Sequence, residues 1–181
     1  MIDKAFIDSH IEELIDCVNK ASKEIINVYE GDNFGHIEKS DGSPLTIADK
    51  NANQVILDDL KSISSDISII SEETFENNQL KKLDKTYWLV DPLDGTKEFI
   101  NKTDEFTVNI ALIDNKQAIF GIVAAPVTGK VWYGSVFDKN ITEEGPVDKI
   151  RIVMSKSHKS ENDKAFLEFI DSKNINYEII E

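Results

Sequence analysis

The sequence predicts an α+β fold, in which helices cover one face of a largely antiparallel sheet and the beginning of an α/β domain follows. Two amphipathic helical patterns open the chain, and a series of strands joined by short turns comes after them. Beyond a polar stretch, a strand–helix–strand pattern ends the sequence. We therefore expect two domains, residues 1–149 and 150–181. The second is incomplete, because three elements cannot bury both faces of a parallel sheet.

Two helices are indicated before the first strand. Apolar residues spaced three and four apart predict a long helix over residues 5–29. Thr46 and Asp49 form a capping pair that opens a second helix, which reaches about residue 63. The polar, glycine-containing and proline-containing stretch between the helices predicts a loop over residues 32–45.

Short apolar runs bounded by turn residues predict the strands. In the first domain they cover residues 67–70, 87–90, 106–113, 118–125 and 131–137. Asp114-Asn115-Lys116 is placed as a hairpin turn between two of them. A polar linker at residues 138–149 leads to the second domain. That domain is expected to contain a strand at 150–154, a helix opened by Ser160 and Asp163, and a strand at 175–180.

Acidic residues dominate the charge of the chain. Among 181 residues there are 20 basic and 34 acidic ones, which gives a net charge of −14. This balance argues against a nucleic-acid polymer or an anionic membrane as a partner. No apolar run is long enough to cross a bilayer, and we expect a cytoplasmic protein. The single cysteine, Cys17, lies in the apolar stripe of the first helix and is expected to be buried and unreactive.

A strand expected at residues 87–90 leads directly into the hexapeptide Asp-Pro-Leu-Asp-Gly-Thr at residues 91–96. The hexapeptide reads as a turn, because proline fixes its own φ and glycine permits a tight backbone path. Such a turn can aim the carboxylates of Asp91 and Asp94 and the carbonyl oxygen of Leu93 at one point. Oxygen ligands of this kind suit Mg²⁺. An ordinary Pro-Asp-Gly-type turn is the alternative.

Further groups could complete a site around the hexapeptide. The backbone N–H groups of Gly95 and Thr96 are free to bind a phosphate next to a metal. Glu72 and Glu73 follow the strand expected at residues 67–70, so neighbouring strand ends would deliver carboxylates to one edge of the sheet. By themselves, the two glutamates favour a solvated loop or a helix start over a metal site.

The hexapeptide, with Lys97-Glu98-Phe99 after it, resembles the inositol monophosphatase-like family of metal-dependent, lithium-sensitive phosphatases. Within that family the longer motif is similar to the CysQ-type 3'(2'),5'-bisphosphate nucleotidases. The resemblance implies the layered α+β sandwich of the family. It also implies a reaction of sulfur metabolism that removes the 3'-phosphate from 3'-phosphoadenosine 5'-phosphate and gives AMP and phosphate.

The resemblance implies a metal site and names its ligands. These are the carboxylates of Glu72, Asp91 and Asp94 and the carbonyl of Leu93, with Glu73 secondary. A complete enzyme of this kind would hold two or three Mg²⁺ ions, and Mn²⁺ is an alternative. Two ions about 4 Å apart would stabilise the attacking and the leaving oxygens of an in-line displacement.

The resemblance also implies which residues activate water and bind substrate. Asp49 would accept a hydrogen bond from the Thr96 hydroxyl, and Thr96 would take a proton from the attacking water; capping the second helix is the alternative role of Asp49. The expected substrate contacts come from two places: the end of the motif at residues 91–99 and the segment that follows the strand at 150–154. They are Gly95, Thr96, Lys97, Glu98, Ser155 and His158. Exposed helix-start and loop positions are the alternatives for the last four.

One family feature is missing from the sequence. Family members continue into a Trp-Asp segment whose carboxylate completes the second metal site, but neither Trp88 nor Trp132 precedes an aspartate here. We therefore expect a fragment or a natural truncation that is inactive or weak by itself and that self-associates through its incomplete second domain. The alternatives are a phosphatase for inositol monophosphate or another small phosphate ester, and a non-catalytic metal-binding or pairing domain.

Overall fold

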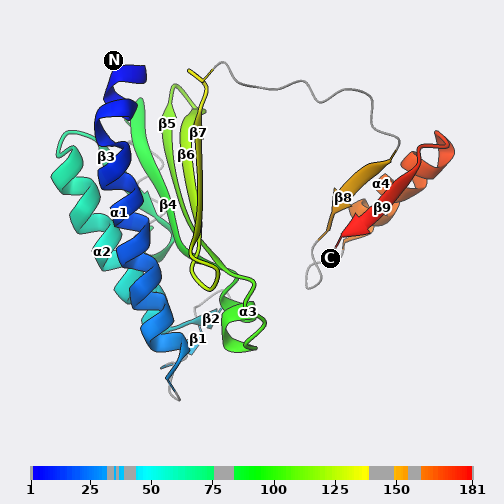
Figure 1. The fold of residues 1–181 in the computed structure, drawn as a ribbon, viewed down its shortest axis with the longest axis horizontal. Coiled ribbons are helices and arrows are strands. Elements are labelled where there is room, and N and C mark those ends of the chain that lie inside the picture. The colour runs from blue at the N-terminus through cyan, green and yellow to red at the C-terminus, as the bar shows by residue number, and fades with distance from the viewer. Residues whose placement is uncertain are drawn as a thin grey trace. The chain divides into compact units, whose positions relative to one another are not determined.

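The computed structural model describes residues 2–31, 35, 37–38, 44–75, 84–138, 149–154 and 160–180. The chain forms two compact units, Met1–Lys139 and Asn140–Glu181 (Figure 1). The assignment of domains to residues 1–149 and 150–181 stays a prediction.

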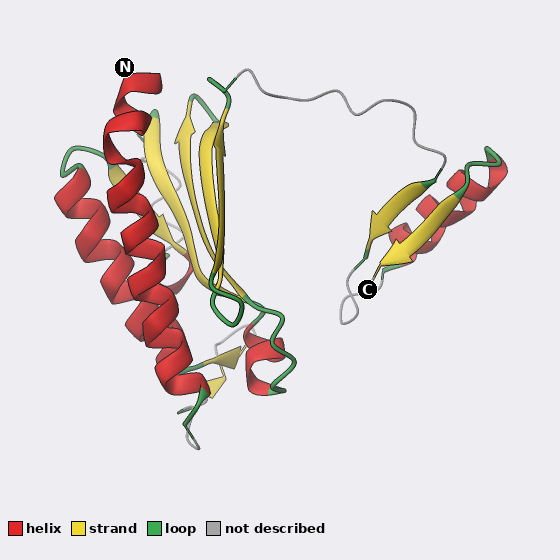
Figure 2. Cartoon of the chain, viewed as in Figure 1, coloured by secondary structure: helices red, strands yellow, loops and turns green. Residues whose placement is uncertain are grey.

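The first unit has two layers. Helices α1 (Lys4–Tyr29) and α2 (Ile47–Ile63) cover one face of a sheet (Figure 2). Within the described residues, the sheet has five strands in chain order, with β3 and β4 parallel and the other neighbours antiparallel. They are β3 (Ser68–Ser71), β4 (Thr86–Asp94), β5 (Thr107–Asp114), β6 (Gln117–Ala125) and β7 (Lys130–Ser135). The predicted α+β architecture is confirmed.

Local signals start both helices where the sequence predicts them. The Asp3 carboxylate accepts a hydrogen bond from the backbone N–H of Phe6 at 3.0 Å and caps α1. Thr46 and Asp49 form the expected capping box of α2. The Thr46 side chain accepts a hydrogen bond from a backbone N–H of the first turn, and the Asp49 side chain accepts one from the backbone N–H of Thr46. Both caps hold N–H groups that the helices themselves leave unpaired.

One apolar core joins the helices to the sheet. Alternate side chains of β4, β5 and β6 point to the helical layer and are buried, as the period of two of a strand requires. The predicted stripes of both helices face them. The largest fully buried side chains include Leu14, Ile25, Ile56, Leu60, Trp88, Leu112 and Ile122. Cys17 belongs to the same core, so its predicted burial is confirmed. Burial raises the pKa of its thiol to about 12, which favours the protonated form.

The tight hairpin between β5 and β6 confirms the predicted turn. Asn115 and Lys116 have φ values of +50° and +66°. Two successive residues with positive φ are the geometry of a type I′ turn, whose twist matches that of the flanking strands.

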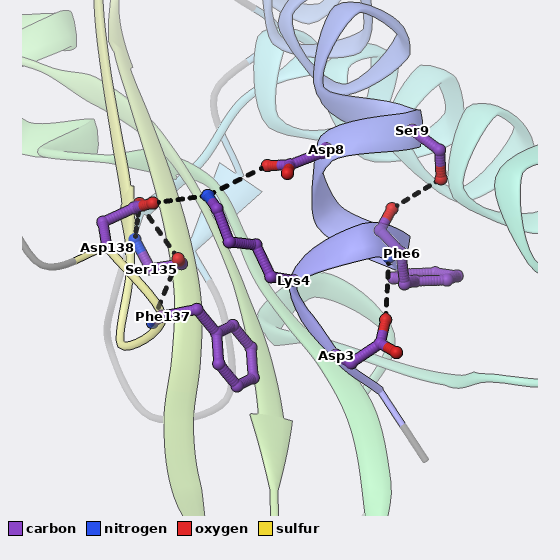
Figure 3. A network of polar contacts seen from close by, with 8 residues as sticks. All are labelled: Asp3, Lys4, Phe6, Asp8, Ser9, Ser135, Phe137 and Asp138. Carbon is purple, nitrogen blue, oxygen red and sulfur yellow. Dashed lines mark hydrogen bonds and ion pairs between the residues drawn. The ribbon is translucent and has the colours of Figure 1, made fainter.

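An exposed polar network joins the start of α1 to the end of β7 (Figure 3). The Lys4 ammonium group contacts the carboxylates of Asp138 at 2.8 Å and Asp8 at 3.2 Å. Asp138 also accepts a hydrogen bond from the Ser135 hydroxyl at 2.9 Å. All three charged groups are exposed to solvent, so the network adds little stability.

Two local expectations were wrong. The stretch at 32–45, expected as a loop, contains an antiparallel pair, β1 (Ile37–Glu38) and β2 (Pro44–Leu45). The turn expected to start at Asp91 starts four residues later. β4 continues through Asp94 because β5 pairs with it on both sides of an irregularity, and the chain turns only at Gly95 into the short helix α3 (Thr96–Ile100).

The second unit is a strand–helix–strand motif. It contains β8 (Ile150–Val153), α4 (Glu161–Ser172) and β9 (Tyr177–Ile180), and its two strands pair in parallel, as predicted. Val153 is 79% exposed and Phe169 is 56% exposed, while self-association of the chain stays a prediction. None of the helices in the described part of the chain has both the length and the apolar content that a membrane span requires.

Candidate active site

The parallel pairing of β3 with β4 brings two acidic residues to one edge of the sheet. Ser71 is paired with Val90, and the next residues along the two strands are Glu72 and Asp91. Glu72 begins the turn that follows β3, while Asp91 lies within β4, which continues to Asp94. The two carboxylates are neighbours, as expected, although only one of them follows the end of a strand.

Asp91 lies in an electrostatically unfavourable position. Its Oδ1 atom is buried and has no hydrogen-bond partner among the described residues. The pKa of the Asp91 carboxyl is raised to about 7, first by burial and then by the negative charges of Glu72 and Asp94. A hydrogen bond with Glu72 that favours the protonated form adds to the shift. A buried carboxylate oxygen without a donor, next to two further carboxylates, is an environment that suits a cation.

A β-bulge separates Asp91 from Asp94. Asp91 pairs with Asn109 and Asp94 pairs with Thr107, so β4 spans this interval with one residue more than β5. Pro92 lies in the bulge, a position where a sheet tolerates proline, which has no N–H. In a regular strand, side chains point alternately to the two faces of the sheet. The extra residue of the bulge breaks this alternation between Asp91 and Asp94. Asp94 is exposed and accepts a 3.5 Å hydrogen bond from the Asn109 amide.

Gly95 makes the turn from β4 into α3 possible. Its φ is +90°, and a Cβ atom at this position would lie 2.8 Å from the carbonyl oxygen of Glu105. Its own carbonyl accepts the first hydrogen bond of the helix, from the Phe99 N–H at 2.8 Å. Both the left-handed backbone and the close approach require glycine.

Thr96 and Asp49 are hydrogen-bonded, although 47 positions separate them. The Thr96 hydroxyl lies 3.2 Å from Asp49 Oδ1 and 3.1 Å from the carbonyl oxygen of Leu93. Asp49 uses its other oxygen, Oδ2, to accept hydrogen bonds from the Thr46 N–H at 2.7 Å and the Thr46 hydroxyl at 2.6 Å. The capping role and the contact with Thr96 therefore coexist on separate oxygens.

Burial controls the protonation of Asp49. The side chain is buried, and burial raises the pKa of its carboxyl above the usual value, while the hydrogen bonds from Thr46 and Thr96 offset part of the shift. A carboxylate held in this way is a stronger base than one at the surface.

A buried polar pair that the sequence did not reveal lies next to Asp49. The Ser71 hydroxyl, at the end of β3, donates to Asn53 Oδ1 on α2 at 2.6 Å. The only signal in the sequence for this pair was Asn53, a polar residue within the buried stripe of the second helix, one turn after Asp49.

A second group of residues missed in the sequence holds the chain after α3. The Tyr29 hydroxyl donates to the Asp104 carboxylate at 2.6 Å, and the rings of Tyr29, Phe99 and Phe106 pack with centroids 4.8–5.3 Å apart. Lys102 and Asp104 both have positive φ, at +58° and +67°. The end of α1 therefore holds a strained loop that follows α3.

The remaining expected substrate contacts are partly described. Lys97 is exposed on α3, and Glu98 is half-buried beside it. Ser155 and His158 lie outside the described residues.

The donor set fits a hard cation, although it is not gathered tightly. The carboxylates and the Leu93 carbonyl are all oxygen ligands, which Mg²⁺ prefers. In the described ranges, no three acidic, histidine or cysteine side chains come close enough to hold a metal ion by themselves.

A family model for inositol monophosphatases matches residues 8–174. The chain belongs to the inositol monophosphatase family. Members of this family, including its bisphosphate nucleotidases, are metal-dependent phosphatases, and this family member shares their fold.

Several nucleotidases of the family are similar to the chain. The 3'(2'),5'-bisphosphate nucleotidase CysQ of Shigella flexneri is 39% identical over 168 residues, which are 87% of this chain and 68% of that protein. CysQ of Escherichia coli K12 shows the same identity and coverage. The crystal structure of CysQ from Bacteroides thetaiotaomicron superposes with a TM-score of 0.77 at 30% identity, covering 95% of this chain and 72% of that one.

Proposed function

We propose that this family member is a Mg²⁺-dependent 3'(2'),5'-bisphosphate nucleotidase that removes the 3'-phosphate of 3'-phosphoadenosine 5'-phosphate. The similarity to CysQ proteins supports the substrate class. The observation that carries the proposal is the group of carboxylates around Asp91, whose buried Oδ1 has no hydrogen-bond partner among the described residues. The hydrogen bond between Thr96 and Asp49 accompanies it.

In this proposal, the metal ligands are the carboxylates of Glu72, Asp91 and Asp94 and the carbonyl of Leu93. Mg²⁺ bound there would neutralise phosphate charge and favour deprotonation of water at neutral pH. The raised pKa of Asp91 supports the assignment, because a group that resists a negative charge gains most from a neighbouring cation.

Thr96 and Asp49 would move the proton of the attacking water. The Thr96 hydroxyl donates toward Asp49 Oδ1, which leaves a lone pair on Thr96 Oγ1 to accept a proton from water. As that proton arrives, the original hydroxyl proton passes to Asp49, whose burial favours the protonated state. The resulting hydroxide would attack phosphorus while the bond from phosphorus to the 3'-oxygen breaks. The leaving oxygen would take a proton from solvent water, and Asp49 would release its proton to solvent.

The motif residues would also orient the substrate. The backbone N–H groups of Gly95 and Thr96 can donate to phosphate oxygens at the turn into α3. Lys97 and Glu98 occupy the following positions and would contact the nucleotide. Ser155 and His158, outside the described residues, complete the proposed contacts.

The test compares two substrates on the full chain. Phosphate release and Mg²⁺-dependent binding are measured with 3'-phosphoadenosine 5'-phosphate and with inositol 1-phosphate, with and without Li⁺. We expect Mg²⁺-dependent binding that favours the nucleotide, and weak, lithium-sensitive turnover. Preference for inositol 1-phosphate would favour the alternative phosphatase function, and metal binding without phosphate release from either compound would favour a non-catalytic domain.

A further inference from the structure

We infer that Asn53 is a positioning residue of the metal site, which holds Glu72 in place through the hydroxyl of Ser71. The inference rests on the proposed function, because it concerns the placement of a proposed ligand. Neither Asn53 nor Ser71 would contact the metal or the substrate.

The contact between Asn53 and Ser71 is short and shielded from water. The Ser71 hydroxyl donates to Asn53 Oδ1 at 2.6 Å, and the residues are only 1% and 6% exposed, respectively. A buried hydroxyl without an acceptor carries a desolvation penalty of about 1–3 kcal/mol. The end of β3 is therefore bound to α2 at one defined point, immediately before Glu72.

Ser71 gives up its usual local role to make this contact. It occupies the N-cap position of the 3₁₀ helix η1 (Glu72–Thr74), where a serine side chain normally accepts a hydrogen bond from the helix backbone. No such hydrogen bond is made within this described segment. The Ser71 side chain instead points into the protein toward Asn53, so the position of Glu72 depends on α2 rather than on its own turn.

The same helix holds both halves of the proposed site. Asp49 and Asn53 lie one turn apart on α2, about 6 Å along its axis. Asp49 contacts Thr96, which follows β4, and Asn53 contacts Ser71, which ends β3. Since α2 packs against β3, β4 and η1, these two buried side chains fix how far the end of β3 lies from the start of α3.

Removal of either partner should loosen the ligand and leave the fold intact. Substitutions of groups that orient metal ligands typically reduce metal affinity about 10–100-fold. We therefore expect Asn53→Ala and Ser71→Ala each to weaken Mn²⁺ binding by about 10-fold. Because the two residues act through one contact, the double variant should be no weaker than either single one.

The experiment measures Mn²⁺ affinity of the full chain by calorimetry and its stability by urea unfolding. Ser71→Thr keeps the hydroxyl and should restore near-normal affinity. Thr86→Val is the matched control, since it removes a 2.6 Å side-chain hydrogen bond to Asp114 at the opposite end of β4. It should lose stability and keep its Mn²⁺ affinity.

The outcomes separate this inference from the proposed function. Unchanged affinity in Asn53→Ala, with weakened binding in Glu72→Gln, would overturn the positioning role alone. Equal loss of affinity in Thr86→Val would also overturn it, because the effect would then reflect general destabilisation. If the wild-type chain binds no Mn²⁺, or Glu72→Gln binds it normally, both the metal site and the positioning role are refuted.

Discussion

Replacement of Asp91 by asparagine should stabilise the protein in EDTA and remove its response to Mg²⁺. Burial and the nearby carboxylates raise the pKa of Asp91 from 3.8 to about 7. Above pH 7 the folded protein must therefore hold a negative charge where it is disfavoured. Asparagine has almost the same shape and carries no charge, so it relieves this cost and at the same time removes a proposed ligand.

The size of the effect follows from the pKa. At about 1.36 kcal/mol per pH unit, the change from 3.8 to about 7 sets an upper limit of about 4 kcal/mol. Asp91 is only partly buried, and solvent screening reduces the expected gain to about 1–2 kcal/mol. In the first unit this corresponds to a Tm increase of about 3–8 °C.

The gain should depend on pH in a defined direction. The folded protein keeps the Asp91 proton up to about pH 7, while the unfolded chain releases it near pH 3.8. The contribution of Asp91 to the free energy of unfolding therefore falls as the pH rises through this range. The advantage of the asparagine variant should be small near pH 4 and largest above pH 7.

Thermal unfolding at pH 4.5 and pH 8, in EDTA and in Mg²⁺, measures both effects. At a Mg²⁺ concentration of ten times Kd, the wild type should gain about 1.4 kcal/mol and Asp91→Asn should gain nothing. Asp58→Asn, on the exposed face of α2, is the control for loss of one negative charge. An Asp91→Asn protein less stable than the wild type at pH 8 in EDTA would refute the reasoning, and an equal Mg²⁺ response would remove Asp91 from the metal site.

Three further substitutions test the surroundings of the site. Thr96→Ala should lower kcat about 10²–10⁴-fold with little change in KM, and near-normal turnover in steady-state assays would leave Thr96 with a structural role only. Gly95→Ala should lower the free energy of unfolding, measured in urea, by roughly 1–3 kcal/mol. The control Gly129→Ala should lower it less, because Gly129 also has a positive φ but has open space around it. Tyr29→Phe should cost about 1 kcal/mol through loss of the hydrogen bond to Asp104, whereas an unchanged free energy of unfolding would mean that the bond adds no stability.

Features that depend on near neighbours in the chain were predictable. The capping box of α2 arises within four residues, and the turn at Asn115 and Lys116 follows from short-range backbone preferences. The turn expected at Asp91 failed for a different reason. Its position is set by pairing with Asn109 and Thr107 on β5, which local turn preferences do not include.

The chemical groups of the proposed site follow from the residue types: carboxylates at Asp91 and Asp94, a glycine at the turn into α3, and a hydroxyl at Thr96. These depend on residue type and close spacing, which the chain carries before it folds. Which residues that lie far apart in the chain come into contact depends on the tertiary structure. The contact of Ser71 with Asn53 and that of Tyr29 with Asp104 join positions 18 and 75 residues apart. Such pairs form because α1 and α2 pack on one face of the sheet in a single arrangement. Burial of the apolar side chains of the whole core determines that arrangement.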